Sequence, residues 1–354
     1  MWYECRMSFW NNLPKPIIVL APLANVTDAS FRQVIAKCSR HTRKDGTEGG
    51  PDVMWTEFVS ADGLMRATPE GKKKLMADLL YTEAERPIVA QLFSSNPEHM
   101  ESATRLCVEL GFDGIDINMG CPDKTIEKQG CGAAMIRHPE HAVAIIRAVK
   151  RGVESSNRKI PVSVKTRIGY NKNELATWLP TLLAENPAVI TIHARTRKEM
   201  SKVPARWEHV QEAVQIRNEL QGTVWQKQNP HSHPTLIFGN GDVITLQEAY
   251  TRAEETGADG VMLGRAIFGN PWLFNPEVTG EKLDVSERLR VMCEHTRLFE
   301  EILPFKNFAL MKKHYKAYVH NFDGAKELRA ELMEQSTADE IQEVVNRWLA
   351  EQVR

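Results

Sequence analysis

The chain has 354 residues, of which 42% are hydrophobic and 26% are charged, and its formal net charge is -1. This length allows one large domain and a smaller one, and the composition is that of an ordinary soluble globular protein. Six scattered cysteines without a CxxC pair argue against a disulfide scaffold and favour a reduced compartment.

The N-terminal stretch MWYECRMSFWNNLPKP has no charged head followed by an apolar segment, so it does not have the pattern of a signal peptide. No apolar run approaches the roughly 18 residues of a membrane helix. We therefore expect a cytoplasmic protein without membrane contact. The balanced charge argues neither for nor against nucleic-acid binding, because a local basic patch can bind phosphate.

Short apolar, β-branched runs recur along the chain, separated by segments with the spacing of amphipathic helices. The runs are IIVLA (17–21), VMWT (53–56), IVAQL (88–92), GIDIN (114–118), VSVKT (162–166), VITIH (189–193), TLIFG (235–239) and GVMLG (260–264). Between them, 138–153 has helical spacing, and the capping box Thr245 to Glu248 opens a helix that ends near Gly257.

Eight such β/α units have the size of a TIM (β/α)8 barrel, and the competing architecture is a doubly wound sheet. The count of eight favours the barrel, as does the lack of a GxGxxG turn after the first strand. We predict an α/β fold whose first part, residues 1–280, is the barrel. The barrel pattern stops near 275–288, and residues 281–354 are predicted to form a small helical domain.

Polar residues stand at the ends of these runs, where buried parallel strands are normally apolar. They are Pro22, Glu57, Gln91, Asn118, Lys165, Arg167, His193, Arg195, Asn240 and Arg265. Any one of them could be a satisfied structural group. A whole set at the same end of the strands indicates a site, because a barrel opens its active site at the carboxyl ends of its strands.

Two glycine-rich loops, FGNGDV (238–243) and LGRAIFGNPWLF (263–274), follow the last two strands. Barrels often hold a phosphate with these two loops, and Arg265 could add a charge-assisted contact. Ordinary turn chemistry is the alternative reading. Together with Lys165 and Gln91, which can hydrogen-bond a flavin ring, the loops favour FMN as the ligand.

Eight motifs follow one another along residues 16–335. They are APLANVTDASFR (21–32), TEF (56–58), AQLF (90–93), DINMGCPDK (116–124), VKTRIGY (164–170), TIHARTR (191–197), GNGDV (239–243) and GADGVMLGRAIFGNPWLF (257–274). In this order the motifs resemble those of the tRNA-dihydrouridine synthases, and more closely the B-type bacterial branch. The stretches 39–52 and 220–234 depart from the pattern and are interpreted as loop insertions at the surface.

The resemblance implies an FMN-binding barrel that uses NADPH to reduce the C5–C6 bond of a uridine in tRNA. The cofactor-binding positions it implies are Pro22, Leu23, Ala24, Gln91, Lys165, His193, Asn240, Gly241, Asp242, Gly264 and Arg265. Expected substrate contacts come from Asn118, Arg167, Arg195, Lys312 and Lys313. We expect a monomer without a metal. A different FMN barrel that acts on a free small molecule is the alternative.

Two cysteines lie ten positions apart, Cys121 in a Gly-Cys-Pro turn and Cys131 between two glycines. A metal pair lacks further ligands at suitable spacing, and a disulfide conflicts with a reduced compartment. The resemblance assigns the catalytic cysteine to Cys121, as the proton donor. Cys131, in a run of small residues, is predicted to be a packing residue where a helix begins.

The segment 305–322 interleaves lysines with aromatic residues. Its plain reading is an amphipathic helix with an aromatic core face and a solvated basic face. In the light of the resemblance, the basic face becomes a tRNA surface, while most of the aromatic residues stay in the core.

Overall fold

The computed structural model describes residues 9–43, 46–222, 227, 233–278 and 283–352. The predicted boundary between residues 280 and 281, and most of the predicted insertion 220–234, lie outside them. The chain forms two compact units. The barrel unit comprises 1–22, 52–79 and 86–264, and the helical unit comprises 23–51, 80–85 and 265–354.

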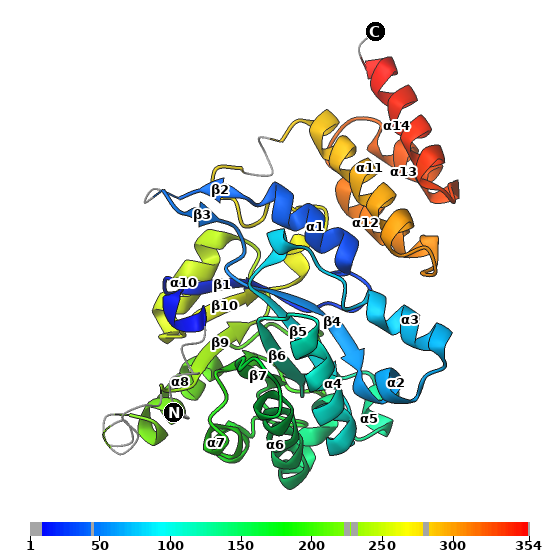
Figure 1. The fold of residues 1–354 in the computed structure, drawn as a ribbon. Coiled ribbons are helices and arrows are strands. Elements are labelled where there is room, and N and C mark those ends of the chain that lie inside the picture. The colour runs from blue at the N-terminus through cyan, green and yellow to red at the C-terminus, as the bar shows by residue number, and fades with distance from the viewer. Residues whose placement is uncertain (1–8, 44–45, 223–226, 228–232, 279–282, 353–354) are drawn as a thin grey trace. The chain divides into compact units, whose positions relative to one another are not determined.

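The barrel unit is built on an eight-stranded parallel sheet (Figure 1). Its strands are β1 (Ile17–Leu20), β4 (Met54–Ser60), β5 (Ile88–Phe93), β6 (Gly114–Asn118), β7 (Val162–Arg167), β8 (Val189–His193), β9 (Leu236–Asn240) and β10 (Gly260–Leu263). Each one overlaps one of the eight predicted runs. The runs are apolar because both faces of such strands are buried.

Neighbouring strands follow chain order, from β4 through β10, and β1 pairs with β10. The ring closes where β1 meets the start of β4: a parallel bridge joins Val19 to Val53, and the Leu20 amide donates to the Val53 carbonyl at 3.1 Å. The predicted TIM-barrel class is therefore confirmed, and the doubly wound alternative is excluded.

Helices alternate with the strands on the outside of the barrel (Figure 1). They are α2 (Ala61–Arg66), α3 (Pro69–Ala77), α4 (Pro97–Glu109), α5 (Lys124–Lys128), α6 (Pro139–Glu154), α7 (Leu175–Ala184), α8 (Glu208–Leu220) and α10 (Leu246–Thr256), with 3-10 turns η2 (Phe9–Asn12) and η4 (Gly132–Arg137). The predicted helix after Thr245 is confirmed: the Thr245 side chain accepts from the Glu248 amide, and Gly257 ends the helix in the left-handed conformation.

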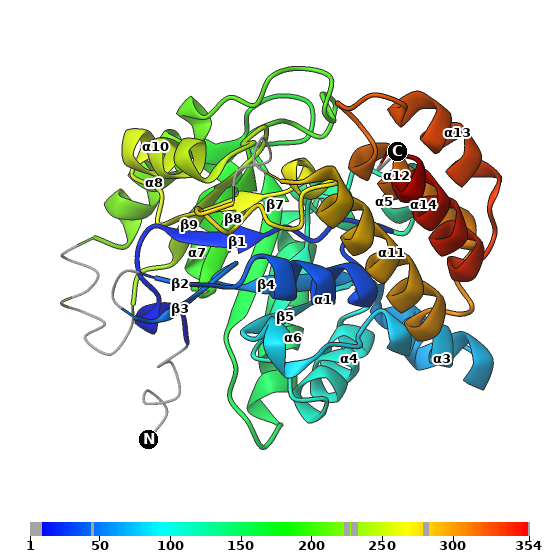
Figure 2. The same cartoon turned by 90° about the horizontal axis from the view of Figure 1, so that it is seen from above.

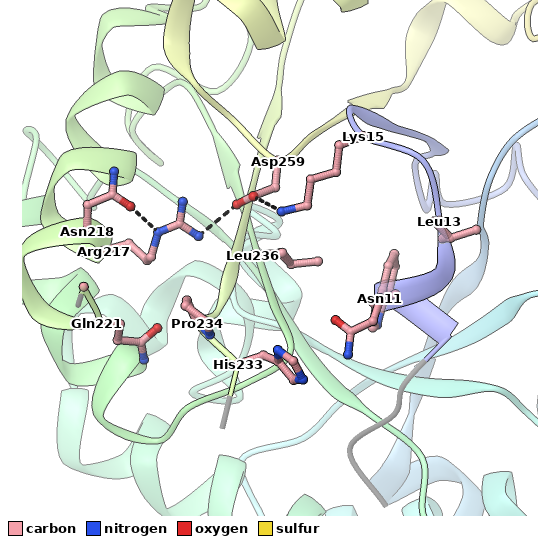
Figure 3. A pocket seen from close by; sticks show the side chains of 12 residues that line it. Asn11, Leu13, Lys15, Arg217, Asn218, Gln221, His233, Pro234, Leu236 and Asp259 are labelled. Carbon is pink, nitrogen blue, oxygen red and sulfur yellow. Dashed lines mark hydrogen bonds and ion pairs between the residues drawn. The ribbon is translucent and has the colours of Figure 1, made fainter. Parts of the chain in front are cut away.

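A pocket of about 560 Å³ lies at the amino ends of β9 and β10 (Figure 3). Asp259 forms ion pairs there with Lys15 at 2.6 Å and with Arg217 at 2.9 Å. The Arg217 guanidinium also donates to the Thr235 carbonyl at 2.6 Å. These bonds join the segments that lead into β1, β9 and β10, so we read this end of the barrel as structural.

The helical unit contains α1 (Ala29–Cys38), α11 (Val285–Ile302), α12 (Lys312–Tyr318), α13 (Ala325–Glu334) and α14 (Ala338–Gln352), with 3-10 turns η3 (Glu83–Glu85), η5 (Arg265–Ile267) and η6 (Phe308–Met311). Helix α11 packs against α1, α12 and α14, and α12 packs against α13 (Figure 2). A short hairpin, β2 (His41–Thr42) with β3 (Glu48–Gly49), occupies the predicted loop 39–52.

The core of the helical unit holds two buried histidines. The His295 ring stacks on Phe31 with a centroid distance of 4.5 Å, and the His314 ring meets His295 edge to face at 4.7 Å. Tyr315 and Tyr318 of α12 are also fully buried, while Lys316 is exposed. The prediction that most aromatic residues of 305–322 belong to the core holds for these two, whereas Phe305, Phe308 and Phe322 are only partly buried.

Burial, together with the charge of Lys313, lowers the pKa of His295 to about 3. The unfolded chain protonates this histidine near its ordinary value of 6.5, so between pH 6.5 and 3 the unfolded chain binds more protons. The free energy of unfolding should therefore fall as the pH falls, by about 2 kcal/mol between pH 7 and pH 5 from His295 alone.

Urea titrations at pH 7 and pH 5 measure this loss. His295→Phe keeps a planar ring on Phe31 and should reduce the loss by about 2 kcal/mol. Part of the loss should remain, because burial also lowers the pKa of His314 well below 6.5. His138→Gln, at an exposed position, should leave the loss unchanged. Equal losses in the wild-type chain and in His295→Phe would contradict the expectation.

Candidate active site

The carboxyl ends of the parallel strands bring a set of polar side chains to one end of the barrel. Those predicted from the sequence that belong to the barrel unit are Pro22, Gln91, Asn118, Cys121, Lys165, Arg167, His193, Arg195, Asn240, Gly241, Asp242 and Gly264. Their contacts cross from strand to strand and define the candidate site.

Cys121 lies in a turn that the barrel holds at four backbone positions. The Asn118 side-chain oxygen accepts from the amides of Gly120 at 3.1 Å and Cys121 at 2.9 Å. The Cys121 carbonyl accepts from the Ala133 amide at 2.9 Å, and the Gly120 carbonyl accepts from Nε of Arg167 at 2.7 Å. The backbone that carries the thiol is therefore fixed by the neighbouring strands and by η4.

The Cys121 side chain is partly exposed. Burial raises its pKa, and the Asp123 amide and the charges of Arg167 and Lys165 only partly oppose this shift. The thiol therefore carries its proton at neutral pH. A protonated thiol in a fixed turn can act as a general acid.

Cys131 has a different environment although it is close in sequence. It is completely buried, it precedes η4 as the N-cap residue, and burial raises its pKa to about 11. The prediction that Cys131 is a packing residue where a helix begins is confirmed. Both thiols are free.

Lys165 and Asn240 form a pair across the barrel mouth. Nζ of Lys165 donates to the Asn240 side-chain oxygen at 3.2 Å, and the Asn240 amide nitrogen donates to the Met262 carbonyl at 2.8 Å. Burial and the charge of Arg167 lower the pKa of Lys165 to about 8, although Asp116 opposes the shift. The Lys165 ammonium therefore loses its proton, and with it its positive charge, at mildly alkaline pH.

Arg195 connects His193 with Asp242. Its three nitrogen groups donate to His193 Nε2 at 3.0 Å, to the Val203 carbonyl at 2.6 Å and to the Asp242 carboxylate. Because a guanidinium only donates, His193 accepts at Nε2 and carries its proton on Nδ1. Arg195 is almost fully buried, so these contacts favour a role in orienting His193 and Asp242.

The Arg167 guanidinium also donates hydrogen bonds to backbone carbonyls. Besides Gly120 it contacts the carbonyls of Thr196 at 3.2 Å and Met200 at 3.1 Å. Burial lowers its pKa to about 10, which leaves it charged at neutral pH. The predicted substrate contacts of Arg167 and Arg195 stay predictions, and the observed contacts describe two residues that tie loops together.

Two features of the site were missed by the sequence reasoning. Asp116, in the middle of β6, is completely buried and accepts from Gln91 and Ser163. An acidic residue within an apolar parallel strand was the available signal.

The second feature is Tyr170. Its ring lies against the guanidinium groups of Arg137 at 4.2 Å and Arg197 at 5.4 Å. This contact joins separate loops, so no local sequence pattern predicts it.

Five predicted residues belong to the helical unit: Leu23, Ala24, Arg265, Lys312 and Lys313. The Leu23 amide donates to the Thr27 hydroxyl at 2.9 Å, and Nζ of Lys313 donates to the Asn25 carbonyl. Arg265 is exposed at the start of η5. Their proposed part in cofactor or substrate binding stays a prediction.

Within the described ranges, no group of three or more His, Cys, Asp or Glu residues is arranged to hold a metal ion. No helix in the described part of the chain combines the length and the apolar character that a membrane crossing needs. The predicted cytoplasmic location and monomeric state stay predictions.

The sequence matches the family model described as "Dihydrouridine synthase (Dus)" over residues 19–353. It is 37% identical to the "Probable tRNA-dihydrouridine synthase 2" of Bacillus subtilis, over 96% of each chain. It is 35% identical to a "Probable tRNA-dihydrouridine synthase" of Staphylococcus aureus, over 98% of this chain and 97% of that one. A histamine dehydrogenase from Rhizobium sp. 4-9 matches 84% of this chain and 51% of its own with a TM-score of 0.48 and 11% identity, too weak a likeness to carry an argument.

Gly132 tests how tightly the Cys121 turn is packed. It has a φ of +60°, and an added Cβ would lie 2.6 Å from the Cys121 carbonyl oxygen. Gly132→Ala should lower the free energy of unfolding by about 2 kcal/mol or more, because left-handed strain and a backbone clash add together. Denaturant titration measures the loss.

Gly130→Ala is the matched control. Its φ of +74° brings the same kind of strain, but the nearest atom to an added Cβ is the Ser95 Cβ at 3.5 Å, an ordinary contact. If Gly132→Ala costs no more than Gly130→Ala, the turn is not held as described.

Proposed function

Because the chain belongs to the dihydrouridine synthase family, we propose that it is a tRNA-dihydrouridine synthase that uses FMN and NADPH to reduce the C5–C6 bond of a uridine in tRNA. One observation carries the proposal to this chain's residues. It is the Cys121 turn at the barrel mouth, with a protonated thiol whose pKa responds to the charges of Lys165 and Arg167.

The donor set at the mouth fits FMN. A flavin edge offers carbonyl oxygens and ring nitrogens, and Gln91, Lys165 and Asn240 supply amide and ammonium groups from three strands. Gly241 and Asp242, with φ of +131° and 62°, turn the chain after β9, and Gly264 follows β10, so two turns with glycine stand where a barrel often holds a phosphate. When bound, FMN reduced by NADPH would supply hydride to C6 of the uracil.

Cys121 then supplies the proton that C5 requires. Its raised pKa keeps the proton on sulfur until a strongly basic carbon develops beside it. The four backbone hydrogen bonds of the turn hold the backbone that carries the sulfur, which reduces the reorganisation needed for proton transfer. His193, with its proton on Nδ1, and the charge of Lys165 would stabilise negative charge on carbonyl oxygens.

A uracil in folded tRNA must leave its stack to reach a barrel mouth, and holding the extruded nucleotide requires contacts with the backbone. We propose that the basic residues of α12, including Lys312 and Lys313, supply part of this contact. The burial of Tyr315 and Tyr318 supports this, because these two rings of α12 are not accessible to RNA while Lys316 is exposed.

The decisive experiment is to incubate the purified protein with FMN, NADPH and tRNA that lacks dihydrouridine, and then to map dihydrouridine by sequencing. We expect one uridine position to be reduced. Free uracil and orotate, which both have a C5–C6 double bond that NADPH can reduce through FMN, replace the tRNA in parallel reactions. Turnover of only these compounds would replace the proposal with the small-molecule alternative. Protein that is colourless after incubation with FMN and removal of the unbound FMN would refute the flavin assignment.

Cys121→Ala separates the two half-reactions. The variant should keep reduction of bound flavin by NADPH within about twofold, while uridine reduction falls by a factor of about 10² or more, the range of general-acid catalysis. Stopped-flow absorbance measures the first step and dihydrouridine formation the second.

Cys131→Ala is the matched cysteine control. It should keep both steps, at the expense of about 1 kcal/mol or more of stability from the small cavity that it leaves. Normal uridine reduction by Cys121→Ala would show that another group donates the proton.

Lys165 should impose an alkaline limit on flavin reduction. Its ammonium is present below about pH 8 and is lost as the pH rises through that value. The rate of flavin reduction by NADPH should therefore decline above pH 8, and Lys165→Met should be slower throughout and lack this decline. An unchanged alkaline limb in Lys165→Met would assign the titration to another group.

A further inference from the structure

We propose that Asp116 is a positioning residue that sets the direction of a hydrogen-bond relay running from the barrel interior to the Cys121 turn. This inference rests on the proposed function, because it concerns the step in which Cys121 donates a proton. Asp116 itself lies on β6, two residues before Asn118 and five before Cys121, with β5 and β7 on either side (Figure 1).

The relay is continuous in its contacts. The Gln91 amide nitrogen donates to Oδ2 of Asp116 at 2.7 Å, and the Asn118 amide nitrogen donates to the Gln91 side-chain oxygen at 3.0 Å. The Asn118 side-chain oxygen then accepts from the Gly120 and Cys121 amides. Gln91 is 1% exposed and Asn118 is 6% exposed, so water has little access to these groups.

The Asp116 end of the relay fixes the direction in which its hydrogen bonds donate. An ionised carboxylate accepts hydrogen bonds and cannot donate them, whereas each primary amide could face either way. Asp116 therefore turns the Gln91 NH2 group toward itself and the Gln91 oxygen toward Asn118. Asn118 must then present its NH2 group to Gln91, which leaves its oxygen for the two turn amides.

The carboxylate form prevails at neutral pH. Burial raises the pKa of Asp116 to about 6, while hydrogen bonds from Ser163 and Gln91 and the charge of Lys165 oppose the shift. The Ser163 hydroxyl donates to Oδ1 of Asp116 at 2.6 Å. Ser163 therefore satisfies the second carboxylate oxygen without taking part in the relay itself.

Reversal of the relay would disturb the proton donor. With both amides turned around, the Asn118 NH2 group would face the Gly120 and Cys121 amides, donor against donor. Both amides would lose their shared acceptor, and amides that are partly shielded from water are costly to leave without one. We therefore expect the position of Cys121, and with it proton transfer to uridine, to depend on the acceptor-only character of Asp116.

Three variants test this. Ser163→Ala removes a partner of Asp116 but keeps the carboxylate. Asp116→Asn offers an amide that can still accept from Gln91 if its NH2 group turns to Ser163. In the double variant Asp116→Asn/Ser163→Ala, the NH2 group introduced at position 116 has no Ser163 hydroxyl to bond with. This NH2 group should therefore turn to Gln91, which reverses the relay.

A fourth variant, Asp116→Asn/Asn118→Asp, moves the carboxylate to the turn. In the reversed relay, the carboxylate introduced at position 118 would accept from Gln91 and from the turn amides. The swap should therefore restore the hydrogen bonds of the turn without a carboxylate at position 116.

Two readouts are taken on the FMN-loaded protein: hydrogen–deuterium exchange of peptides covering 119–122, and flavin reoxidation by tRNA after reduction with NADPH. Ser163→Ala should stay within about twofold of wild type in both. The double variant with Ser163→Ala should exchange faster in the turn and lose about tenfold or more in reoxidation, beyond the product of the single effects. Flavin reduction by NADPH reports whether the remaining site is intact.

The carboxylate swap should recover exchange protection in the turn. The relay is refuted if the double variant keeps wild-type protection, or if the swap leaves the turn as exposed as in that variant. Should the double variant not fold, the swap still tests the relay, because it should keep the turn as protected from exchange as in the wild type, and faster exchange there would refute the relay. Wild-type protein that makes no dihydrouridine would instead refute the proposed function, and the exchange measurements would then judge the relay alone.

Discussion

A polar side chain inside a closed barrel of parallel strands has little water to bond with, so it finds its partner on another strand. In this chain the partners run around the ring. Gln91 on β5 meets Asp116 and Asn118 on β6, Ser163 on β7 meets Asp116, and Lys165 on β7 meets Asn240 on β9. The geometry of the candidate site follows from this requirement, because each side chain is oriented by the bond it must make.

The same burial adjusts the charges that the proposed reaction needs. Loss of hydration lowers the pKa of Lys165 to about 8 and raises that of Cys121, so that near neutral pH the lysine is still charged and the thiol is still protonated. The two groups also influence each other: the charge of Lys165 lowers the pKa of Cys121, and Cys121 raises the pKa of Lys165. A cation and a proton donor are thus available at one mouth over the same pH range.

The eight strands and the residues at their ends could be predicted because they leave local signals. A parallel strand buried on both faces is an apolar run, and a polar residue at its end stands out. Asp116 was missed because it lies within a strand rather than at its end. The β2–β3 hairpin has few apolar residues and was read as a loop. The association of residues 23–51 with α11 was also not predictable, because packing between distant segments has no local pattern.

The two cysteines of GCPDKTIEKQGCG are the same residue type, and their different roles follow from where the fold places them. Cys131 caps the start of η4, and the amide of Ala133 in η4 donates to the Cys121 carbonyl at 2.9 Å. At Gly132, which lies between Cys131 and Ala133, there is no room for a side chain against that carbonyl. The buried Cys131 therefore belongs to the element that supports the turn of the partly exposed Cys121. The ten-residue spacing between the two cysteines contains α5, after which the chain returns to the Cys121 turn. A pair that resembled a metal site or a disulfide in sequence is, in the fold, a proposed proton donor and part of its support.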